Sequence, residues 1–185
     1  MNEQRKHRVC PVERAGMLDH PLRRLYENPA RILRPYVGEG MSVLDFGGGT
    51  GFFTLELARM VGPAGHVTAV DLQPGMVENA RQKLAAARLE ERVTFRATRA
   101  DAIGAGGPFA FALVFHVLHE VPDTARFLGE LRSLLAPGRR ALVAEPGFHI
   151  GRGEFAVSLD LARRAGWSVG PGPRILFNRT AVLEA

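Results

Sequence analysis

Short apolar runs alternate with longer amphipathic stretches along most of the chain. Runs rich in β-branched and aromatic residues, without a polar side, occupy residues 42–46, 66–70, 93–97, 109–115, 141–144 and 175–183, and Trp167 begins one more before the last. Residues 50–61, 75–88, 124–135 and 154–165 have helical periodicity. Strands separated by helices predict right-handed crossovers and a mainly parallel sheet. Because the strand runs are apolar on both sides, we expect helices on both faces.

Proline and glycine punctuate these elements. Gly62-Pro63 ends the first helix, Pro74 opens the second, and Pro137-Gly138 ends the helix over residues 124–135 before the next strand. The turn over residues 170–173 (Gly-Pro-Gly-Pro) is too short for a crossover helix, so the two strands around it are predicted to be antiparallel. Two short helices over residues 21–27 and 29–36 precede the first strand. We therefore expect one structural domain of the α/β class, with a seven-stranded, mostly parallel sheet and an antiparallel C-terminal strand.

Composition changes this picture little. The chain has 185 residues, of which 46% are hydrophobic and 23% charged, which fits one globular domain and excludes disordered, coiled-coil and collagen-like chains. No apolar run approaches the roughly 18 residues that cross a bilayer, and the N-terminus has no signal-peptide pattern. The single cysteine, Cys10, cannot form an internal disulfide. From these features we expect a cytoplasmic protein without a membrane partner.

The charge balance at first suggests a nucleic-acid partner. The formal net charge is +5 and the isoelectric point is about 10.3. The basic residues, nearly all arginine, are however scattered as singles or pairs such as Arg139-Arg140 and form no single stripe. This distribution disfavours nucleic acid.

The strongest chemical signal is a glycine loop after the first predicted strand. Gly47, Gly49 and Gly51 occupy alternate positions shortly after Asp45 and lead into a helical pattern. Glycines allow a tight turn and close approach of a ligand, and a helix N-terminus offers N–H groups to an anionic group. Twenty residues after Gly51 the second strand is followed by Asp71, a carboxylate suited to the hydroxyls of a ribose. Together these features predict a nucleotide-like ligand.

Two common phosphate-binding sites fit this loop poorly. A dinucleotide fingerprint needs a glycine where this chain has Phe52 or Thr54, depending on which glycine is counted first. No Gly-Lys-Ser/Thr follows, which excludes a P-loop. Structural roles remain as alternatives to ligand binding. The glycines alone could form a simple tight turn, and Asp71 could cap a helix.

Residues 43–53, Val-Leu-Asp-Phe-Gly-Gly-Gly-Thr-Gly-Phe-Phe, resemble motif I of the class I S-adenosylmethionine (SAM)-dependent methyltransferases. The resemblance is closest to the ubiquinone/menaquinone-biosynthesis-like branch and is strong over residues 32–145. It implies a Rossmann-like fold, a methyltransferase domain over residues 38–185 behind an N-terminal helical cover over residues 1–37, SAM as the cofactor and S-adenosylhomocysteine as the product.

In that family the glycine loop holds the methionine part of SAM, and the acid after the second strand binds the ribose. The residue after that acid packs on the adenine, and a polar residue after the third strand binds its amino group. The resemblance therefore implies a cofactor site formed by Asp45, Gly47, Gly49, Gly51, Asp71, Leu72, Asp101, Ala102 and Phe115.

Candidate catalytic groups follow the fourth predicted strand, whose edge faces the methyl group in this fold. His116 is the first candidate for a general base, and His119 or Glu120 is the second. A base accelerates methylation of an acidic acceptor by roughly 10²–10⁴-fold. The same side chains could instead fasten the turn through bonds between histidine and carboxylate.

A second acid and histidine follow the fifth strand. Glu145 and His149 are expected at the same sheet edge, where open α/β sheets bind ligands. With the groups after the fourth strand they are metal-ligand types, but the spacing matches no metal motif, so we predict a polar substrate pocket and no metal site. Cys10 could approach the pocket as a thiol, although an incidental role is simpler.

We thus predict an enzyme, a SAM-dependent methyltransferase for a small-molecule acceptor. Motifs for methylation of nucleic-acid bases, Asn/Asp-Pro-Pro-Tyr/Phe and Pro-Cys, are absent after the fourth strand. Without an inserted domain, the pocket needs a cap from the N-terminal helices, short loops or a second subunit in a homodimer. An RNA or protein methyltransferase and a non-catalytic SAM- or nucleotide-binding module stay as alternatives, and the acceptor atom stays open.

Overall fold

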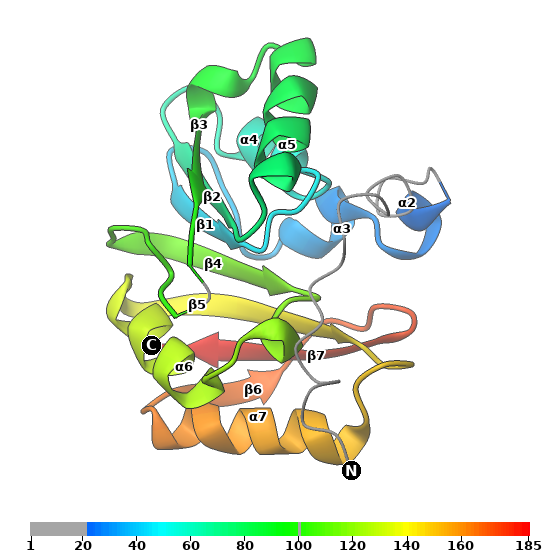
Figure 1. Ribbon diagram of the computed structural model, residues 1–185, viewed down its shortest axis with the longest axis vertical. Coiled ribbons are helices and arrows are strands. Elements are labelled where there is room, and N and C mark those ends of the chain that lie inside the picture. Colours follow the sequence, from blue (N-terminus) through cyan, green and yellow to red (C-terminus); the bar gives the residue numbers. More distant parts are fainter. Residues whose placement is uncertain (1–21, 100) are drawn as a thin grey trace.

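A seven-stranded sheet runs through the computed structural model, which describes residues 22–99 and 101–185 (Figure 1). The strands are β1 (Ser42–Phe46), β2 (His66–Asp71), β3 (Val93–Ala97), β4 (Phe109–Phe115), β5 (Leu135–Pro146), β6 (Ser168–Pro171) and β7 (Asn178–Glu184). Their order is β3-β2-β1-β4-β5-β7-β6. The first five strands of the chain pair in parallel, and β7 is antiparallel to both neighbours. The predicted fold class is confirmed.

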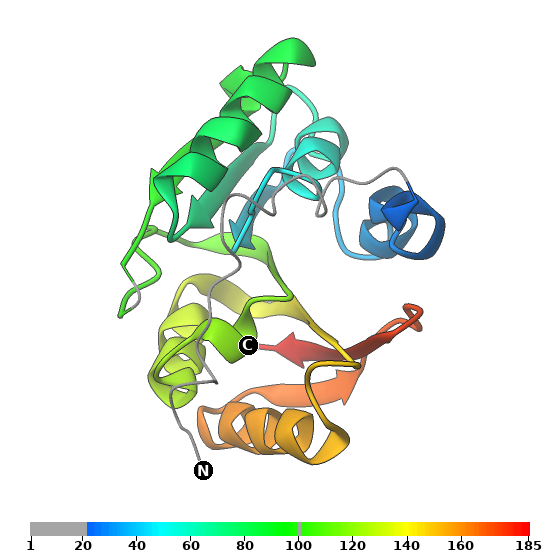
Figure 2. The ribbon, with the colours of Figure 1, turned by 45° about the vertical axis from the view of Figure 1, so that its right-hand side comes forward.

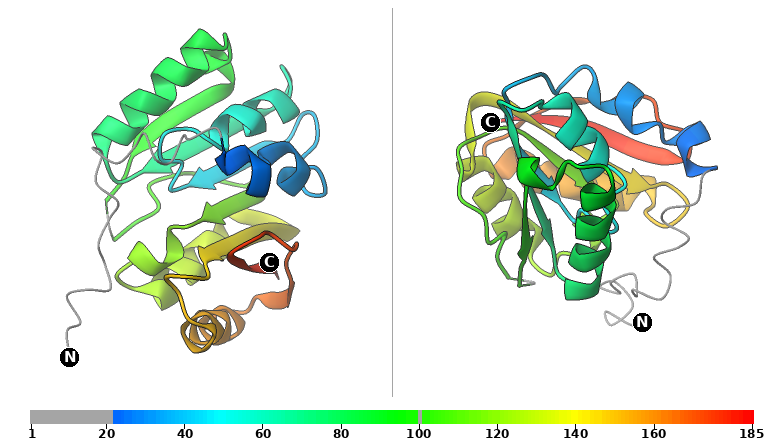
Figure 3. Two further views of the ribbon diagram at one scale, coloured as in Figure 1. Left: turned by 90° about the vertical axis from the view of Figure 1, so that its right-hand side faces the viewer. Right: turned by 90° about the horizontal axis from the view of Figure 1, so that it is seen from above.

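Helices cover both faces of the sheet (Figures 2 and 3). They are α2 (Arg23–Tyr26), α3 (Pro29–Leu33), α4 (Thr54–Met60), α5 (Pro74–Ala86), α6 (Thr124–Ser133) and α7 (Arg152–Arg164), with 3-10 turns η3 (Glu90–Arg92) and η4 (Leu118–Glu120). Apolar residues of α3, α4 and α5 share one core cluster with one face of the strands. Those of α6 and α7 share a second cluster with the opposite face. Among the described residues no helix is long and apolar enough to span a membrane.

The N-terminal helices differ in how they are held. Asn28 accepts a hydrogen bond from the N–H of Arg31 at 3.1 Å, and Pro29 occupies the first helical position, so α3 has a regular start. Ile32 and Leu33 of α3 are buried in the core, whereas α2 has no buried residue. The start of the predicted helix over residues 21–27 and Cys10 lie outside the described residues.

Several element boundaries differ from those expected. The helix predicted over residues 50–61 begins only at Thr54, because the glycine loop continues as turns to Phe53. The fifth strand was expected over residues 141–144, yet β5 begins at Leu135, and the β4–β5 pairing shifts register between Phe109 and Phe111. Pro137-Gly138 therefore lies within the irregular start of this strand instead of in front of it.

The C-terminal strands also begin later than expected. Trp167 precedes β6, is buried, and donates from Nε1 to the carbonyl of Leu128 at 2.9 Å, so it is a core residue. The run over residues 175–183 becomes strand only from Asn178, because Phe177 has a φ of +63°. A residue in this left-handed region cannot continue a strand. The resulting turn sets the position of Asn178.

Candidate active site

A cleft opens at the carboxyl ends of β1, β2 and β4. Its empty space is about 1030 Å³, including open solvent at the mouth. Ligands of open α/β sheets bind at this edge. Of the predicted site residues, the cleft is lined by Asp45, Gly47, Gly49, Asp71, Leu72, Phe115, His116 and Glu120.

The glycine loop needs glycine for two different reasons. Gly47, Gly49 and Gly51 have φ values of +74°, +54° and +79°, which other residues rarely adopt. A Cβ on Gly47 would lie 2.7 Å from Val117, and one on Gly51 would lie 3.1 Å from Ala80 of α5. A Cβ on Gly49 would meet only the carbonyl oxygen of Gly47, at 3.9 Å. Gly47 and Gly51 therefore permit close packing within the protein, and Gly49 keeps the cleft open.

Asp71 connects the loop to the end of β2. Its Oδ2 accepts a hydrogen bond from the N–H of Gly49, and its Oδ1 accepts one from the N–H of Gln73, each at 2.9 Å. Burial raises the pKa of Asp71, while these hydrogen bonds act in the opposite direction. A carboxylate oxygen can accept more than one hydrogen bond. Asp71 can therefore hold the loop and still accept a ligand hydroxyl.

The walls beside Asp71 combine a buried acid with an exposed apolar side chain. Asp45 is buried, and its Oδ2 accepts a hydrogen bond from Oγ1 of Thr54 at 2.6 Å. Burial raises the pKa of Asp45 to about 6, although this bond to Thr54 lowers it. Leu72 is 38% exposed at the rim. An exposed leucine there offers a flat base an apolar surface.

Asp101 and Ala102 line a smaller pocket that adjoins the cleft and shares Phe46, Val121 and Pro122 with it. Asp101 is exposed, and its Oδ1 accepts a hydrogen bond from Nε of Arg99 at 3.1 Å. This bond and the charge of Arg99 lower the pKa of Asp101. Gly51 lies against α5 and not in the cleft wall. The structure therefore brings most of the predicted cofactor residues together and leaves these three beside them.

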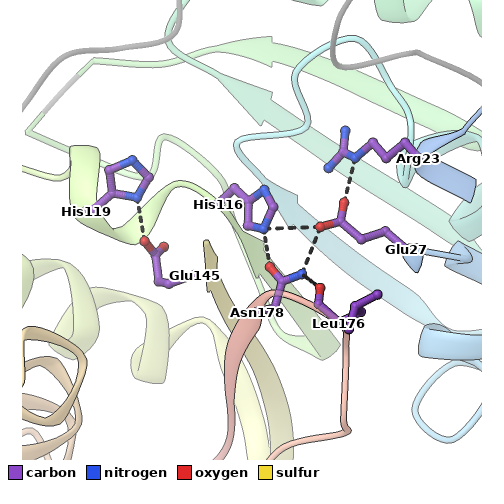
Figure 4. Close-up of polar contacts among 7 residues, drawn as sticks. All are labelled: Arg23, Glu27, His116, His119, Glu145, Leu176 and Asn178. Atoms are coloured by element: carbon purple, nitrogen blue, oxygen red, sulfur yellow. Dashed lines mark hydrogen bonds and ion pairs between the residues drawn. The ribbon is translucent and has the colours of Figure 1, made fainter. Parts of the chain in front are cut away.

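His116 joins a network from distant segments (Figure 4). Its Nε2 is hydrogen-bonded to Oδ1 of Asn178 and lies 3.5 Å from Oε1 of Glu27. Glu27, which is buried, accepts hydrogen bonds from Nδ2 of Asn178 at 2.9 Å and from Nε of Arg23 at 2.6 Å. Burial lowers the pKa of His116, although Glu27 and Asn178 favour its charged form. The imidazole is therefore mainly neutral at neutral pH.

The other candidate histidine has a different environment. Nδ1 of His119 lies 2.5 Å from Oε2 of Glu145, and Oε1 of Glu145 accepts the N–H of Leu118 at 2.9 Å. Burial opposes the charged form, but the hydrogen bond and charge of Glu145 outweigh it and raise the pKa of His119. His119 is not among the cleft residues, and this contact ties η4 to the end of β5. The His119–Glu145 contact is the bond between histidine and carboxylate that the sequence offered as the alternative to a catalytic role.

His149 is exposed, with its ring centroid 5.0 Å from that of His119. In the part of the chain that the structure describes, no group of three or more His, Cys, Asp or Glu side chains could hold a metal ion. Of the acids and histidines of this edge, His119 and Glu145 bond to each other, and His116 bonds to Asn178.

Three residues of the site have no signal in the sequence. Arg23 and Glu27 are four residues apart on a short helix, a spacing that usually marks an exposed ion pair. Asn178 belongs to no motif and follows a left-handed Phe177. Glu27 is buried and Arg23 and Asn178 are partly buried, and only this position near His116 distinguishes them from ordinary surface residues.

Comparisons with known proteins identify the class. A family model described as a methyltransferase domain matches residues 38–160. The chain belongs to this family, and its fold and relatives place it in the class I SAM-dependent methyltransferases. Within that class it is related to the UbiE C-methyltransferases.

The relatives match different shares of the chain. Ubiquinone/menaquinone biosynthesis C-methyltransferase UbiE of Pasteurella multocida is 34% identical over 110 residues, which are 59% of this chain and 41% of that protein. UbiE of Geobacter sulfurreducens is 32% identical over 124 residues, 66% of this chain and 48% of that protein. The chain spans less than half the length of these two relatives. The crystal structure of a SAM-dependent methyltransferase from Aquifex aeolicus has a TM-score of 0.84 and 26% identity and covers 95% of this chain and 98% of its own.

Family membership implies SAM as the cofactor. The cleft residues fit such a ligand, because Asp45 and Asp71 supply carboxylates for hydroxyl and cationic groups and Leu72 supplies an exposed apolar surface. Gly49 adds an open stretch of backbone between the two acids.

Proposed function

We propose that the protein transfers a methyl group from SAM to a small-molecule acceptor. The observation that carries this proposal is that the glycine loop, Asp71 and the neutral His116 line the same cleft. The first two are suited to the cofactor, and His116 is suited to deprotonating an acceptor. Within this proposal the cofactor residues are those that the family resemblance implies.

When bound, SAM supplies an electrophilic methyl group on a positively charged sulfur. Methyl transfer is an in-line displacement, so the protein's task is to align the acceptor atom with the methyl carbon. Asp71 holds the ligand hydroxyls and the loop together. His116 accepts the acceptor's proton, and because burial lowers its pKa it is in the basic form at neutral pH. Glu27, 3.5 Å away, stabilises the imidazolium that results.

We also propose that residues 1–37 form a cover for the catalytic domain over residues 38–185. The support comes from the described part of the cover. The guanidinium of Arg23 lies 4.2 Å from the ring centroid of Phe52, and both residues line the cleft. A cation over an aromatic face contributes about 0.5–2 kcal/mol, depending on its exposure. Arg23 therefore helps to hold α2 at the cleft.

The acceptor that we propose to test first is an aromatic quinol methylated on carbon. The UbiE relatives are C-methyltransferases of ubiquinone/menaquinone biosynthesis by name. Four aromatic side chains line the cleft and suit a flat ring: Phe46, Phe52, Phe53 and Phe115. A quinol hydroxyl next to the reacting carbon offers a proton that a general base can remove as the methyl group is transferred.

Ligand titrations test the cofactor part of the proposal. The melting temperature is measured with SAM, S-adenosylhomocysteine and NADH, and any co-purified ligand is identified by mass spectrometry. SAM and S-adenosylhomocysteine are expected to raise the melting temperature. A shift with NADH and none with SAM or its product would contradict the proposal.

Methyl-labelled SAM then tests the acceptor. The panel contains demethylated quinols, small phenols and thiols, with bulk RNA and protein as separate arms. Label in a small molecule is expected. Label in RNA that falls steeply with salt would instead support an RNA methyltransferase. SAM binding without S-adenosylhomocysteine formation on any acceptor would support a non-catalytic binding module.

A further inference from the structure

We propose that Asn178 and Glu27 hold His116 in a single tautomer, with the proton on Nε2, so that Nδ1 is the atom that receives the acceptor's proton (Figure 4). The catalytic part of this inference rests on the proposed function. The tautomer itself follows from the hydrogen bonds, and it can be measured without a substrate.

The first step is the orientation of the Asn178 amide. Its Nδ2 lies 2.9 Å from Oε1 of Glu27 and 2.9 Å from the backbone carbonyl oxygen of Leu176. A carboxylate and a carbonyl can only accept hydrogen bonds, and an amide nitrogen has two hydrogens to donate. The reversed amide would place its oxygen against both acceptors and leave all three oxygens without a hydrogen. Oδ1 of Asn178 is therefore the atom that faces His116.

The second step is the proton on the imidazole. Oδ1 of Asn178 is an acceptor, so Nε2 of His116 must carry the hydrogen of their bond. The negative charge of Glu27, 3.5 Å from Nε2, favours a proton at the same atom. A neutral imidazole has one N–H group, so Nδ1 keeps a free lone pair.

The third step is the accessibility of Nδ1. Within the described residues, Nδ1 of His116 makes no hydrogen bond, and no buried side-chain nitrogen or oxygen lacks a partner. Nδ1 is therefore not buried. The His116 side chain lines the cleft, and in this proposal the exposed nitrogen serves an acceptor bound there.

The backbone on both sides of the contact is strained. His116 and Phe177, the residue before Asn178, have φ values of +60° and +63°. A left-handed conformation is unfavourable for a residue other than glycine, and such strained residues cluster at functional sites. Hydrogen bonds hold both segments: the N–H of His116 donates to Ala144 O at 2.8 Å, and the N–H of Gly147 donates to Phe177 O at 2.7 Å. The fold therefore forms the His116–Asn178 contact although two residues at it adopt unfavourable φ angles.

The charges around His116 support proton transfer. Glu27 and Glu145 favour the imidazolium, and Arg23 opposes it. Arg23 also donates to Oε2 of Glu27, which keeps Oε1 directed at Asn178 and His116. During transfer the acceptor gives its proton to Nδ1 and uses its electron pair to bond the methyl carbon, while the carbon–sulfur bond breaks with its electrons on sulfur. A positive charge thus disappears at sulfur and appears on His116, beside Glu27.

Nitrogen NMR of the full chain with ¹⁵N-labelled histidine tests the tautomer. The signals of His116 are assigned with the His116→Gln variant. We expect a protonated Nε2 and an unprotonated Nδ1 in the wild type at neutral pH. In Asn178→Ala we expect a mixture of tautomers, with the His66 signals as an internal control at the other end of the sheet. A wild-type His116 protonated on Nδ1 would overturn the proposal.

Kinetics test the positioning role of Asn178. Asn178→Ala is expected to lower kcat at least about tenfold, the effect of one lost hydrogen bond, and to leave the KM for SAM unchanged. Asn178→Asp keeps the oxygen that accepts from Nε2 but places a second oxygen against Glu27 and the Leu176 carbonyl, so it should also lower kcat. The added carboxylate should move the acidic limb of the pH–rate profile to higher pH, because it raises the pKa of His116. Asn79→Ala on α5, outside the cleft, is the matched control.

Two further results distinguish a failure of the positioning role of Asn178 from a failure of the proposed function. An unchanged kcat and pH profile in Asn178→Ala would overturn the positioning role, because a purely structural contact affects neither. The expected tautomer in a protein that methylates no acceptor would overturn the proposed function and the catalytic use of Nδ1, while the tautomer assignment would stand.

Discussion

The two sides of the cleft are built in different ways. On the β1–β2 side, contacts join neighbouring turns: the N–H groups of Gly47 and Gly48 donate to Val70 O at 2.8 and 3.1 Å, and that of Gly49 donates to Asp71. On the β4–β7 side, contacts join side chains of segments far apart in the sequence. His116 and Asn178 are 62 positions apart, and Asn178 and Glu27 are 151 positions apart.

This difference separates two kinds of sensitivity. A site made from backbone groups depends on whether each residue can adopt the required φ angle, and a change acts where it is made. A side-chain network depends on the relative positions of α2, β4 and β7, so a change in one segment acts on the histidine in another. The sides touch where Gly47 meets Val117.

The largest effect on activity is expected on the β4–β7 side of the cleft. His116→Gln should lower kcat by roughly 10²–10⁴-fold, because the general base is lost, while the affinity for SAM stays nearly unchanged. Steady-state kinetics and SAM calorimetry measure the two quantities. His66→Gln, at the start of β2, is the control and should retain kcat. A His116 variant with normal turnover would make this histidine structural.

The contact between the two sides gives the next effect. Gly47→Ala places a Cβ 2.7 Å from Val117 at a φ of +74°, so it should lower the free energy of unfolding by about 2–4 kcal/mol. Urea denaturation measures the loss. In the double variant with Val117→Ala part of the loss should return. Gly129→Ala has no atom within 4 Å of its new Cβ and should stabilise α6 by up to about 1 kcal/mol. Equal effects of both substitutions would contradict the packing argument.

The buried carboxyl group of Asp45 should make the free energy of unfolding depend on pH. The folded pKa of Asp45 is about 6 and its ordinary value is 3.8. Between these values the folded protein holds more protons than the unfolded chain, so the contribution of Asp45 to stability falls as the pH rises from about 4 to about 6. The loss is about 3 kcal/mol, since one pKa unit corresponds to about 1.4 kcal/mol.

Asp45→Asn should remove this pH dependence. Relative to the wild type, the variant's free energy of unfolding should rise by about 3 kcal/mol between pH 4 and pH 7. Denaturation at each pH measures the difference, and the pH 4 measurement, where both side chains are neutral, is the reference. Parallel stability curves for the two proteins would disprove the raised pKa.

The smallest effect is expected at Asp71. Asp71→Ala should weaken SAM binding about tenfold or more, because it removes the acceptor for ligand hydroxyls and the hydrogen bond that positions Gly49. Asp71→Asn keeps one oxygen and should weaken binding less. Calorimetry measures both affinities. Unchanged affinity in the alanine variant would remove Asp71 from the site.

Much of the fold was predictable because its signals are local. The apolar runs that became β1 to β4 and the glycines after β1 record which backbone conformations neighbouring residues can adopt. The positions of Asp71 and His116 were also predictable, since polar residues at the ends of buried parallel strands meet at one edge of the sheet. Asp45, within β1, was implied only by the family resemblance. The early start of β5 was not, because residues from Leu135 join the sheet through a register shift against β4.

The alternatives left open for the histidines depended on their partners. His119 and His116 follow the same strand, yet His119 is bonded to Glu145 and His116 to Asn178. The sequence has acids near both and no pattern that assigns either pair. The structure separates them: His116, with its left-handed backbone, lines the cleft, and His119, on η4, is not among the lining residues.

The α/β class, the glycine loop and the acids at the strand ends could be predicted from the chain alone, because hydrophobic periodicity and the φ requirements of glycine act over a few residues. The meeting of Glu27, from the segment before the sheet, and Asn178, from the last strand, at His116 could not. That meeting depends on the strand order β1-β4-β5-β7 and on the burial of a carboxylate that would otherwise be an ordinary surface residue.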